Sequence, residues 1–319
     1  IGTGWWATDA HIPALLAHPD AELVALCDTR LDKAQAALDW VATQPGPPPA
    51  PQLYTDYCAM LREADIDAAV VVTPHATHYD IVRDCLLAGR HVLVEKPMTL
   101  HARDARHLVE LARAQGRALT VGYPYPHLPF VQRLKAVLAS GELGAVQYVN
   151  GTFASDVRDF LGGHVSPERP PIQAPFRLHG PGEDYNRPQL LGGGHGHLQM
   201  THLLGLLFFL TDLRVERVHA LMANHGLPLD LVDAMTVQFA GGALGVIGGT
   251  GNAGRNYKLG ITLYCEAGAV DIDTVSQHSL IRRADGSRED FGFERGVDSR
   301  FLPSPNLALA FALLRPGAG

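Results

Sequence analysis

Ile1-Gly2-Thr3-Gly4-Trp5-Trp6-Ala7, at the start of the chain, is the stretch that decides the fold. It reads G-x-G-x-x-A, the dinucleotide-binding fingerprint with alanine in the place of the third glycine. Gly2 permits a tight turn out of a strand, Gly4 lets a pyrophosphate approach the backbone, and Ala7 lets the next helix pack closely. That helix directs its free N–H groups toward the phosphates. A glycine-rich turn without a ligand is the alternative, because small residues are common in turns.

The residues after the fingerprint complete a strand–turn–helix–strand unit. Residues 11–18 have the apolar spacing of a helix, and residues 22–27 form a β-rich run that ends at Asp28. An acidic residue at this place accepts hydrogen bonds from the adenosine ribose. Capping of a helix over 31–40 is a second role for Asp28, and both roles can hold. Only Ile1 precedes the turn, so we expect the first strand to lie before it.

Length and composition describe an ordinary globular chain of one or two domains. It has 319 residues, of which 46% are hydrophobic and 18% are charged, so it is long enough to bury a large core. The apolar run 203–210 is far too short to cross a membrane. The net charge of −7 and the pI near 6.1 argue against a nucleic-acid partner. We therefore expect neither a nucleic acid nor a membrane among the partners.

The cysteines favour a reducing compartment. Cys27, Cys58, Cys85 and Cys265 contain no C-x-x-C pair, and two of them fall in predicted strands. We therefore interpret them as reduced core thiols and expect a cytoplasmic protein.

Strands and helices alternate over the first 122 residues, which predicts a doubly wound Rossmann domain over residues 1–122, its first strand truncated. The further strands are expected at 53–56, 68–73, 91–95 and 118–122, and the helices at 57–63, 79–88 and 104–115. Gly89 and Gly116 are the expected caps of the last two helices. The Pro-rich residues 43–51 are expected to form a surface loop.

The pattern of predicted elements changes after residue 122, where strand follows strand with few helices. Helices are expected at 130–139, 198–210 and 307–314, and strands at 146–154, 214–222, 234–239, 243–250, 258–266 and 269–273. Gly241-Gly242 predicts a hairpin turn. Residues 162–188 are expected to form an irregular segment, the irregular excursion. These patterns predict an α+β domain over residues 123–319, with a large, mostly antiparallel sheet.

Two further clusters follow predicted strands of the first domain. Thr73-Pro74-His75-Ala76-Thr77-His78 follows one strand, and Glu95-Lys96-Pro97 follows the next. Ligands bind at such strand ends in parallel sheets. With the fingerprint and the glycine-rich helix start over 192–202, these residues make nearly the whole chain resemble the Gfo/Idh/MocA family of nicotinamide-dependent oxidoreductases. The E-K-P triplet is the most specific single feature.

The resemblance implies a cofactor site along the fingerprint and the strand ends. The residues that it assigns to the cofactor are Gly2, Gly4, Trp5 and Ala7 at the pyrophosphate; Asp28, Thr29 and Arg30 at the adenosine ribose; Thr73, Pro74 and His78 in the groove; and Glu95, Lys96 and Pro97 at the nicotinamide. A cis bond before Pro97 is typical of the family. Asp28 favours NAD as the cofactor, whereas Arg30 keeps NADP open, because an arginine there accommodates a 2′-phosphate.

The resemblance also implies the catalytic residues, with one departure. Lys96 and His202 are the candidates for proton transfer and His197 is the next; Tyr123, His195 and Gln199 are the candidates for substrate binding. Family dehydrogenases usually carry an Asp four residues before the helix histidine, and this chain has Leu198 there. The departure weakens the assignment of the family's proton relay and leaves cofactor binding untouched. A surface lysine and a core histidine are the plain alternatives for Lys96 and His202.

The remaining polar residues give weaker signals. His195, His197 and His202 match no standard zinc spacing and have no carboxylate nearby in sequence, so we expect no metal. Four arginines in the irregular excursion either bind an anionic substrate or are solvated loop charges; they are Arg158, Arg169, Arg177 and Arg187.

These observations lead to the hypothesis that the chain is an NAD(P)-dependent oxidoreductase. It would transfer hydride between nicotinamide and a secondary alcohol or ketone of a sugar, a cyclitol or a related polyol. A dinucleotide-binding regulator without turnover is one alternative, which Leu198 motivates. Elimination or glycoside cleavage assisted by a retained NAD is another. The resemblance further implies that the domain over residues 123–319 binds substrate and joins subunits into a homodimer or homotetramer.

Overall fold

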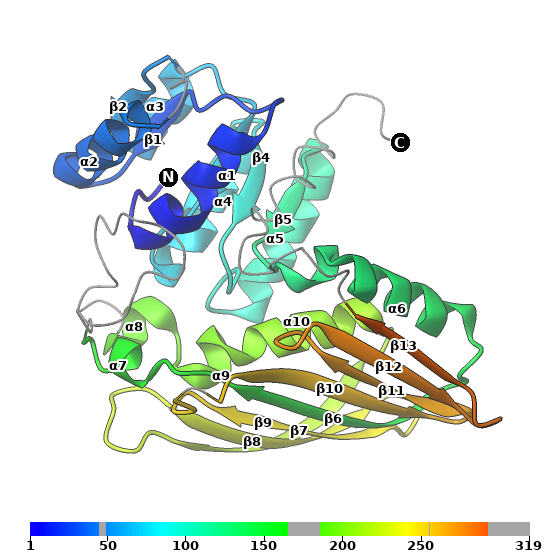
Figure 1. Cartoon of the computed structure of the whole chain (residues 1–319). Coiled ribbons are helices and arrows are strands. Elements are labelled where there is room, and N and C mark those ends of the chain that lie inside the picture. The colour runs from blue at the N-terminus through cyan, green and yellow to red at the C-terminus, as the bar shows by residue number, and fades with distance from the viewer. Residues whose placement is uncertain (45–48, 165–185, 255, 293–319) are drawn as a thin grey trace.

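The computed structural model describes residues 1–44, 49–164, 186–254 and 256–292. An N-terminal part of parallel strands and helices lies above a large sheet, and helices fill the space between the two (Figure 1). Some sequence-based predictions fall outside these ranges: the helix over 307–314 lies wholly outside them, the irregular excursion mostly, with Arg169 and Arg177, and the Pro-rich loop over 43–51 partly.

The N-terminal part alternates strands with helices as predicted. Its elements are η1 (Ala7–His11), α1 (Ile12–Ala17), β1 (Ala25–Cys27), α2 (Leu31–Ala42), β2 (Gln52–Tyr54), α3 (Tyr57–Glu63), β3 (Ala68–Val71), η2 (His75–Thr77), α4 (His78–Leu87), β4 (His91–Val94), α5 (Ala102–Gln115) and β5 (Leu119–Val121). The fingerprint helix begins with a π-helical turn, η1, before it becomes α-helical. Gly116 ends α5 with a φ of +61°, as expected of a glycine cap.

Ile1 and Gly2 join two groups of parallel strands into one layer. β1 pairs with β2, and β3, β4 and β5 form the second group. The amino group of Ile1 donates to the Val70 carbonyl at 2.8 Å, and the Gly2 N–H donates to the Cys27 carbonyl at 2.8 Å. The order across the layer is therefore β2, β1, residues 1–2, β3, β4, β5. This order sets the fingerprint at the carboxyl edge of the strands, in the middle of the layer.

The remainder of the described chain forms an eight-stranded sheet with helices on one face. Its elements are η3 (Tyr125–His127), α6 (Pro129–Ser140), β6 (Val146–Ala154), α7 (Arg158–Leu161), α8 (Pro188–Leu191), α9 (His195–Leu198), α10 (Met200–Leu210), β7 (Val215–Ala223), β8 (Val232–Phe239), β9 (Leu244–Thr250), β10 (Lys258–Cys265), β11 (Gly268–Asp273), β12 (His278–Arg283) and β13 (Arg288–Gly292). The strand order is β13-β12-β11-β10-β6-β9-β8-β7, and only the β6–β9 pair is parallel. The predicted mostly antiparallel sheet is confirmed, and β12 and β13 extend it beyond the prediction.

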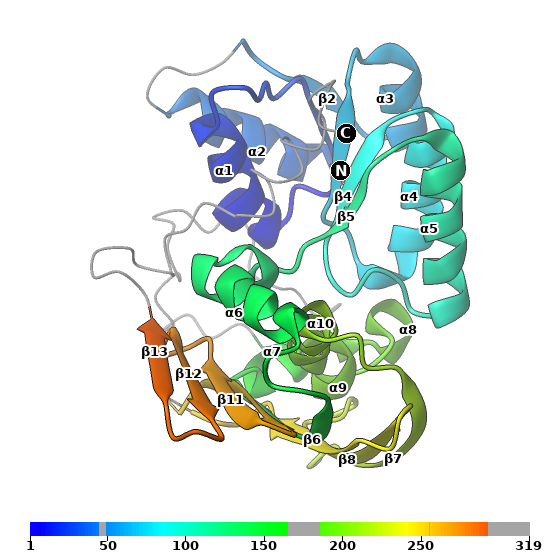
Figure 2. The same ribbon diagram turned by 90° about the vertical axis from the view of Figure 1, so that its right-hand side faces the viewer.

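Helices α6 and α10 cover the face of this sheet that looks toward the N-terminal part (Figures 1 and 2). Met200, Leu203, Leu206 and Leu207 of α10 are fully buried against the sheet. Their sheet partners include Val149, Phe239, Ile247 and Leu263. The opposite face carries exposed apolar side chains, among them Leu221, Leu244, Val246 and Tyr264. The Gly241-Gly242 turn has φ values of +86° and +93°, which confirms the hairpin signal between β8 and β9.

The predicted helix over 198–210 is wrong at its start. The structure has a short helix, α9, that ends at Leu198, and α10 begins at Met200. Gln199 between them has a φ of −108°, away from the helical value near −63°. Leu198 belongs to a separate apolar cluster with Leu161, Leu191, Leu229 and Leu231, whereas Met200 belongs to the core on the sheet. Two cores thus hold the two helices in different directions.

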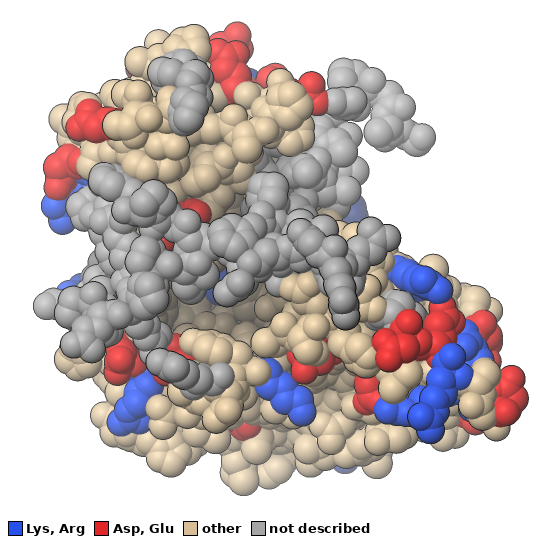
Figure 3. Space-filling model, in the orientation of Figure 1, with Lys and Arg blue, Asp and Glu red and all other residues tan. Residues whose placement is uncertain are grey.

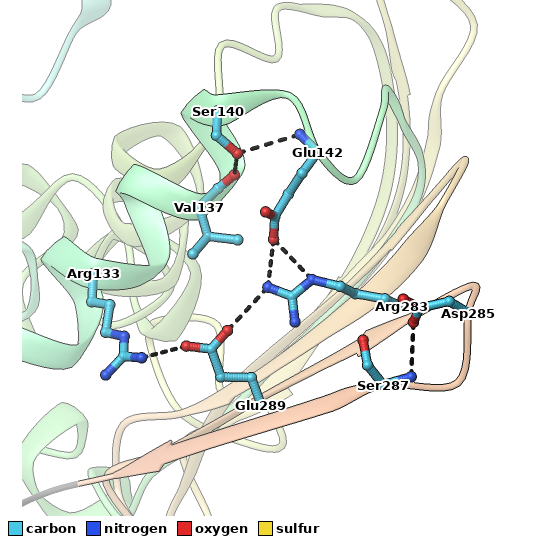
Figure 4. Close-up of polar contacts among 8 residues, drawn as sticks. All are labelled: Arg133, Val137, Ser140, Glu142, Arg283, Asp285, Ser287 and Glu289. Carbon is cyan, nitrogen blue, oxygen red and sulfur yellow. Dashed lines mark hydrogen bonds and ion pairs between the residues drawn. The ribbon is translucent and has the colours of Figure 1, made fainter.

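Ion pairs connect α6 to the edge of the sheet that β12 and β13 form. Lys, Arg, Asp and Glu side chains gather there (Figure 3). Arg283 of β12 pairs with Glu142, which follows α6, and with Glu289 of β13 (Figure 4). Glu289 also pairs with Arg133 of α6. This network links a helix to two strands about 150 residues later in the sequence.

The structure also bears on the predictions about membrane spans and about the cysteines. Among the described residues, no helix is both long enough and apolar enough to span a membrane. All four cysteines are free. Cys27, Cys85 and Cys265 are buried, but Cys58 is half-exposed, so the interpretation of all four as core thiols is wrong for Cys58. Cys58 is in the first turn of α3, whose buried side chains are Met60 and Leu61.

Candidate active site

The fingerprint turn has the shape that a pyrophosphate requires. Gly2 has a φ of +82°, and a Cβ there would lie 2.4 Å from the Val72 carbonyl oxygen. Only glycine therefore fits at this point of the turn. At Gly4, by contrast, no described atom outside the local backbone and the two neighbouring residues lies within 4 Å of where a Cβ would be. Ala7 is 3% exposed and packs against its surroundings as the fingerprint requires. The backbone at Gly4 is thus open to a ligand at the start of η1.

Asp28 is fixed at the end of β1, next to this turn. Its Oδ2 accepts hydrogen bonds from the backbone N–H of Thr3 at 2.9 Å and from the Thr3 hydroxyl at 3.2 Å. Its Oδ1 accepts from the backbone N–H of Arg30 at 3.0 Å. The N-cap of α2 is Arg30, without a side-chain cap bond, so the alternative in which Asp28 caps this helix is wrong. Thr29 and Arg30 are exposed beside it.

Glu95 is a buried carboxylate with three donors. Its Oε1 accepts from the indole N–H of Trp6 at 2.9 Å and lies 2.8 Å from Nε2 of His11; its Oε2 accepts from the backbone N–H of Lys96 at 3.0 Å. Burial by itself raises the pKa of Glu95, but the hydrogen bond and charge of His11, with the charge of Lys96, hold the pKa at about 2. A Cβ at Gly122 would lie 2.8 Å from Oε1. The carboxylate is therefore ionised and held from several sides.

His11 was not among the site residues predicted from the sequence. It lies in the fingerprint helix, is 2% exposed, and reaches the E-K-P triplet 84 positions later. The signal that would have found it is a histidine in the first turns of the fingerprint helix, which faces the ends of neighbouring strands.

His78 braces the loops around the site from inside. It is fully buried, and its Nδ1 and Nε2 lie 2.9 Å from the carbonyl oxygens of Pro97 and Thr73. Burial lowers its pKa against the effect of these carbonyls, so the neutral ring donates to one of them. The ring does not reach the surface of the groove, whereas Thr73 is half-buried and Pro74 is exposed there. The predicted cis bond between Lys96 and Pro97 is present.

Lys96 connects the two parts of the chain. It follows β4, and its Nζ donates to the carbonyl oxygen of Leu198 at 3.4 Å. Burial lowers the pKa of its amine, and the charge of Glu95 opposes that shift. The amine can therefore exchange a proton more readily near neutral pH than an exposed lysine.

His202 lies close enough to Lys96 for the charge of the lysine to act on it, and Tyr123 lies beside His202. The ring of His202 contacts those of Tyr123, Tyr125 and Phe153, with centroids 5.9, 5.9 and 6.1 Å apart. Its Nδ1 is buried and has no hydrogen-bond partner in the described part of the chain. Burial, and then the charge of Lys96, lower the pKa of His202 well below its usual value, so the ring is neutral. The Tyr123 hydroxyl shares a hydrogen bond with Thr201.

The other three predicted residues are not part of this group. His195 is fully buried, with Nδ1 2.6 Å from the Asp233 carboxylate, and its assignment to substrate stays a prediction. His197 is half-buried beside His75, with ring centroids 6.4 Å apart. Gln199 is half-buried at the break between α9 and α10, and its carbonyl accepts from the His202 N–H at 2.9 Å.

Asp230 explains why the start of α9 is rich in glycine. Its carboxylate accepts from the backbone N–H groups of Gly194 and Gly196, both at 2.7 Å, and its carbonyl accepts from the N–H of His195. A Cβ at Gly194 would lie 2.0 Å from the Asp230 carbonyl oxygen.

Among the residues that the structure describes, no three His, Cys, Asp or Glu side chains form a group that could hold a metal ion.

Trp5 reaches from the fingerprint to the second part of the chain. Its ring lies edge-on to Trp6, with centroids 5.2 Å apart, and to Phe160 of α7, at 6.2 Å. Its indole N–H is buried and has no hydrogen-bond partner within the described ranges.

Two family models match the chain. Residues 1–123 match the model described as an oxidoreductase family with an NAD-binding Rossmann fold, and residues 131–271 match the GFO/IDH/MocA C-terminal domain. Together they cover most of the chain.

Curated relatives match over about half of the chain. It is 30% identical over 161 residues to dTDP-3,4-didehydro-2,6-dideoxy-alpha-D-glucose 3-reductase of Streptomyces violaceoruber, covering 48% of this chain and 45% of that protein. It is 31% identical over 146 residues to D-glucoside 3-dehydrogenase of Escherichia coli (strain K12), covering 46% and 40%. The matches thus span less than half the length of these relatives.

A solved structure matches over nearly the whole chain. The WlbA dehydrogenase from Bordetella pertussis, in complex with NADH and UDP-GlcNAcA, superposes with a TM-score of 0.72 at 23% identity, over 98% of this chain and 81% of that one. At this identity the likeness concerns the fold.

Proposed function

The chain belongs to the Gfo/Idh/MocA family of oxidoreductases, and on that premise we propose that it is an NAD-dependent dehydrogenase or reductase. Its substrate would be a secondary alcohol, or the matching ketone, of a sugar, a cyclitol or a related polyol. The names of the curated relatives support this class, because both act on sugars.

The observation that carries the proposal is that Lys96 of the dinucleotide-binding part bonds to the chain just before α10, the helix that carries His202, and that its charge acts on His202. Lys96 follows a strand of the dinucleotide-binding part, and its amine bonds to the carbonyl of Leu198, just before α10. His202 comes from α10, and its ring contacts Tyr123, just after β5. A proton-transfer group of the first part therefore bonds to the second part just before the helix that carries His202, beside the carboxyl edge where a nicotinamide binds.

The residues present fit NAD. The open backbone at Gly4 suits the pyrophosphate, and the fixed carboxylate of Asp28 retains room to accept a ribose hydroxyl. Trp5 and His202 each hold a buried ring nitrogen without a partner among the described residues, as expected of groups that face a ligand. When bound, the nicotinamide accepts or supplies the hydride.

The chain's own residues handle the proton. Lys96 takes the hydroxyl proton of the alcohol at Nζ in oxidation and returns it to the carbonyl oxygen in reduction. The lowered pKa of its amine suits both directions. His202, held neutral by burial, orients the reacting oxygen by a hydrogen bond. His197 lies outside this group and is a secondary candidate.

The structure weakens the reason for the regulator alternative. That alternative rests on Leu198 in the place of the usual Asp, but Leu198 fills an apolar cluster and is 3% exposed. An apolar residue there meets a packing requirement of this chain, whatever the activity.

We further propose that residues 1–122 bind the dinucleotide and that residues 123–319 bind substrate and join subunits into a homodimer or homotetramer. The exposed apolar side chains on the outer face of the eight-stranded sheet support the proposal that this domain joins subunits. A cytoplasmic location stays a prediction from the cysteines.

The deciding experiment follows nicotinamide absorbance with NAD and NADP against a panel of sugars, sugar acids and inositols, on the wild type and Lys96→Ala. We expect turnover in the wild type, a loss of about 100-fold or more in Lys96→Ala, and NADH binding retained in both. Cofactor that binds without any redox change across the panel would favour the regulator. Reduced cofactor that forms and disappears while the substrate is cleaved would favour assisted elimination.

A further inference from the structure

The adenosine-ribose end of the cofactor site carries two carboxylates and one arginine. Asp28 directly follows β1, Arg30 precedes α2, and Asp32 lies in the first turn of α2. Thr3 and the backbone of Arg30 fix the Asp28 carboxylate on both oxygens. This carboxylate therefore stays where a ribose 2′-hydroxyl is recognised.

The Arg30 side chain, by contrast, is held by Asp32. Its Nε donates to Oδ1 of Asp32 at 3.1 Å, and its Nη2 pairs with Oδ2 of the same carboxylate. This is the two-point geometry that suits a guanidinium and a carboxylate, and a guanidinium would offer the same two donors to a phosphate. Asp32 thus occupies the donors that a 2′-phosphate would need.

We propose that Asp32 is a specificity-determining residue for the dinucleotide: by holding the Arg30 guanidinium it denies a 2′-phosphate its cation, and so makes the chain select NAD over NADP. The inference rests on the proposed function, because it concerns the cofactor of that site. It assigns selectivity to a residue outside the fingerprint and outside the acidic position that ends the second strand of such domains.

The charges support this direction. With Arg30 neutralised by Asp32, the carboxylate of Asp28 remains as uncompensated negative charge beside the ribose. A 2′-phosphate would meet that charge, whereas a 2′-hydroxyl donates a hydrogen bond to it. Both side chains of the pair are more than half exposed, so the pair is weak and a phosphate can compete for Arg30 at moderate cost. The effect of Asp32 on selectivity is therefore a matter of several-fold, added to that of Asp28.

The test measures dissociation constants of NADH and NADPH by fluorescence titration of the full chain, without any substrate. The variants are Asp32→Asn, Arg30→Gln and the double variant. Asp271→Asn is the matched control, because it removes a half-buried carboxylate that pairs with Arg282 on the eight-stranded sheet, far along the chain from α2. It changes the net charge equally and leaves the Arg30 pair intact.

We expect the wild type to bind NADH more tightly than NADPH. Asp32→Asn should tighten NADPH binding by about three- to tenfold, with NADH binding within about twofold of the wild type. The double variant should lose this gain, because the gain acts through Arg30.

Three results would overturn the inference: a wild type that prefers NADPH, an Asp32→Asn variant that matches Asp271→Asn, or a gain that survives in the double variant. In the last two cases NADH binding by the wild type leaves the proposed function standing. Failure of the wild type to bind either dinucleotide would overturn both together.

Discussion

His11 and Glu95 lie 84 positions apart in sequence, and the His11 Nε2 atom is 2.8 Å from Oε1 of the Glu95 carboxylate. The contact joins the fingerprint helix to the strand end that carries Lys96. Because Glu95 also accepts the Lys96 backbone N–H, one buried carboxylate ties the phosphate-binding turn to the proposed catalytic lysine.

The ionised Glu95 should make stability fall in acid. Its folded pKa of about 2 lies below the ordinary value of 4.5, so its contribution is present above pH 4.5 and is lost as the pH falls toward 2. The shift corresponds to about 3 kcal/mol at neutral pH. Urea unfolding from pH 2 to 7 should show a steeper acid loss in the wild type than in Glu95→Gln.

The control for that series is Glu63→Gln, which changes an exposed carboxylate on α3. It should follow the wild-type curve. A Glu95→Gln variant whose stability runs parallel to the wild type at every pH would show that the Glu95 carboxylate is not stabilised in the folded state.

Gly122→Ala should disturb the same carboxylate from its other side. The new methyl would lie 2.8 Å from Oε1 of Glu95 in a buried site, which costs about 1–3 kcal/mol by overpacking. Thermal unfolding and the fluorescence of Trp6, which donates to Glu95, are the readouts.

Gly205→Ala in α10 is the matched control, because the nearest atoms to its methyl would be those of the Tyr123 ring at 3.4 Å and alanine favours a helix. It should be neutral or stabilising by up to about 1 kcal/mol. Equal losses in both variants would contradict the role assigned to Gly122.

Leu198→Asp should not restore a proton relay. The new carboxylate would enter the cluster of Leu161, Leu191, Leu229 and Leu231, and would lower stability by about 3 kcal/mol or more. Leu198→Met, which conserves volume, should cost less than about 1.5 kcal/mol. Chemical denaturation measures both losses. A Leu198→Asp variant that is as stable as the wild type and more active would show that its side chain turns toward Lys96.

Arg283→Met should loosen the sheet edge from α6. Hydrogen bonds from Arg283, and then from Arg133, lower the pKa of Glu289, so this stabilisation is present at neutral pH and is lost as the pH falls through the lowered value. Because the network is partly exposed, the loss of Tm at pH 7 should stay below about 3 °C.

The Arg283 effect should shrink in 1 M salt, where exposed ion pairs are screened. It should also disappear in a Glu142→Gln, Glu289→Gln background, in which the guanidinium has lost both carboxylates. A loss of Tm that is unchanged in salt and in that background would assign it to packing of the Arg283 stem.

Much of the site was predictable because it lies close to strand ends that the sequence itself marks. The fingerprint turn, Asp28 and the E-K-P triplet each follow a strand, and parallel strands bring their carboxyl ends to one edge. The residues that hold them were not predictable in this way. His11 and Asp230 act on groups 84 and 34 to 36 positions away, and no local pattern marks those partners.

By itself, the sequence determined the fold class, the order of most strands and helices, and the identity of the residues at the strand ends. It did so because turn geometry and apolar periodicity are local properties of the chain. Only the tertiary structure decided that His195 and His78 are buried braces, that Leu198 belongs to a leucine cluster, and that Lys96 bonds to the Leu198 carbonyl just before the helix of His202. Those outcomes depend on which surfaces pack together, and packing between distant segments fixes the burial and the charge state of each side chain.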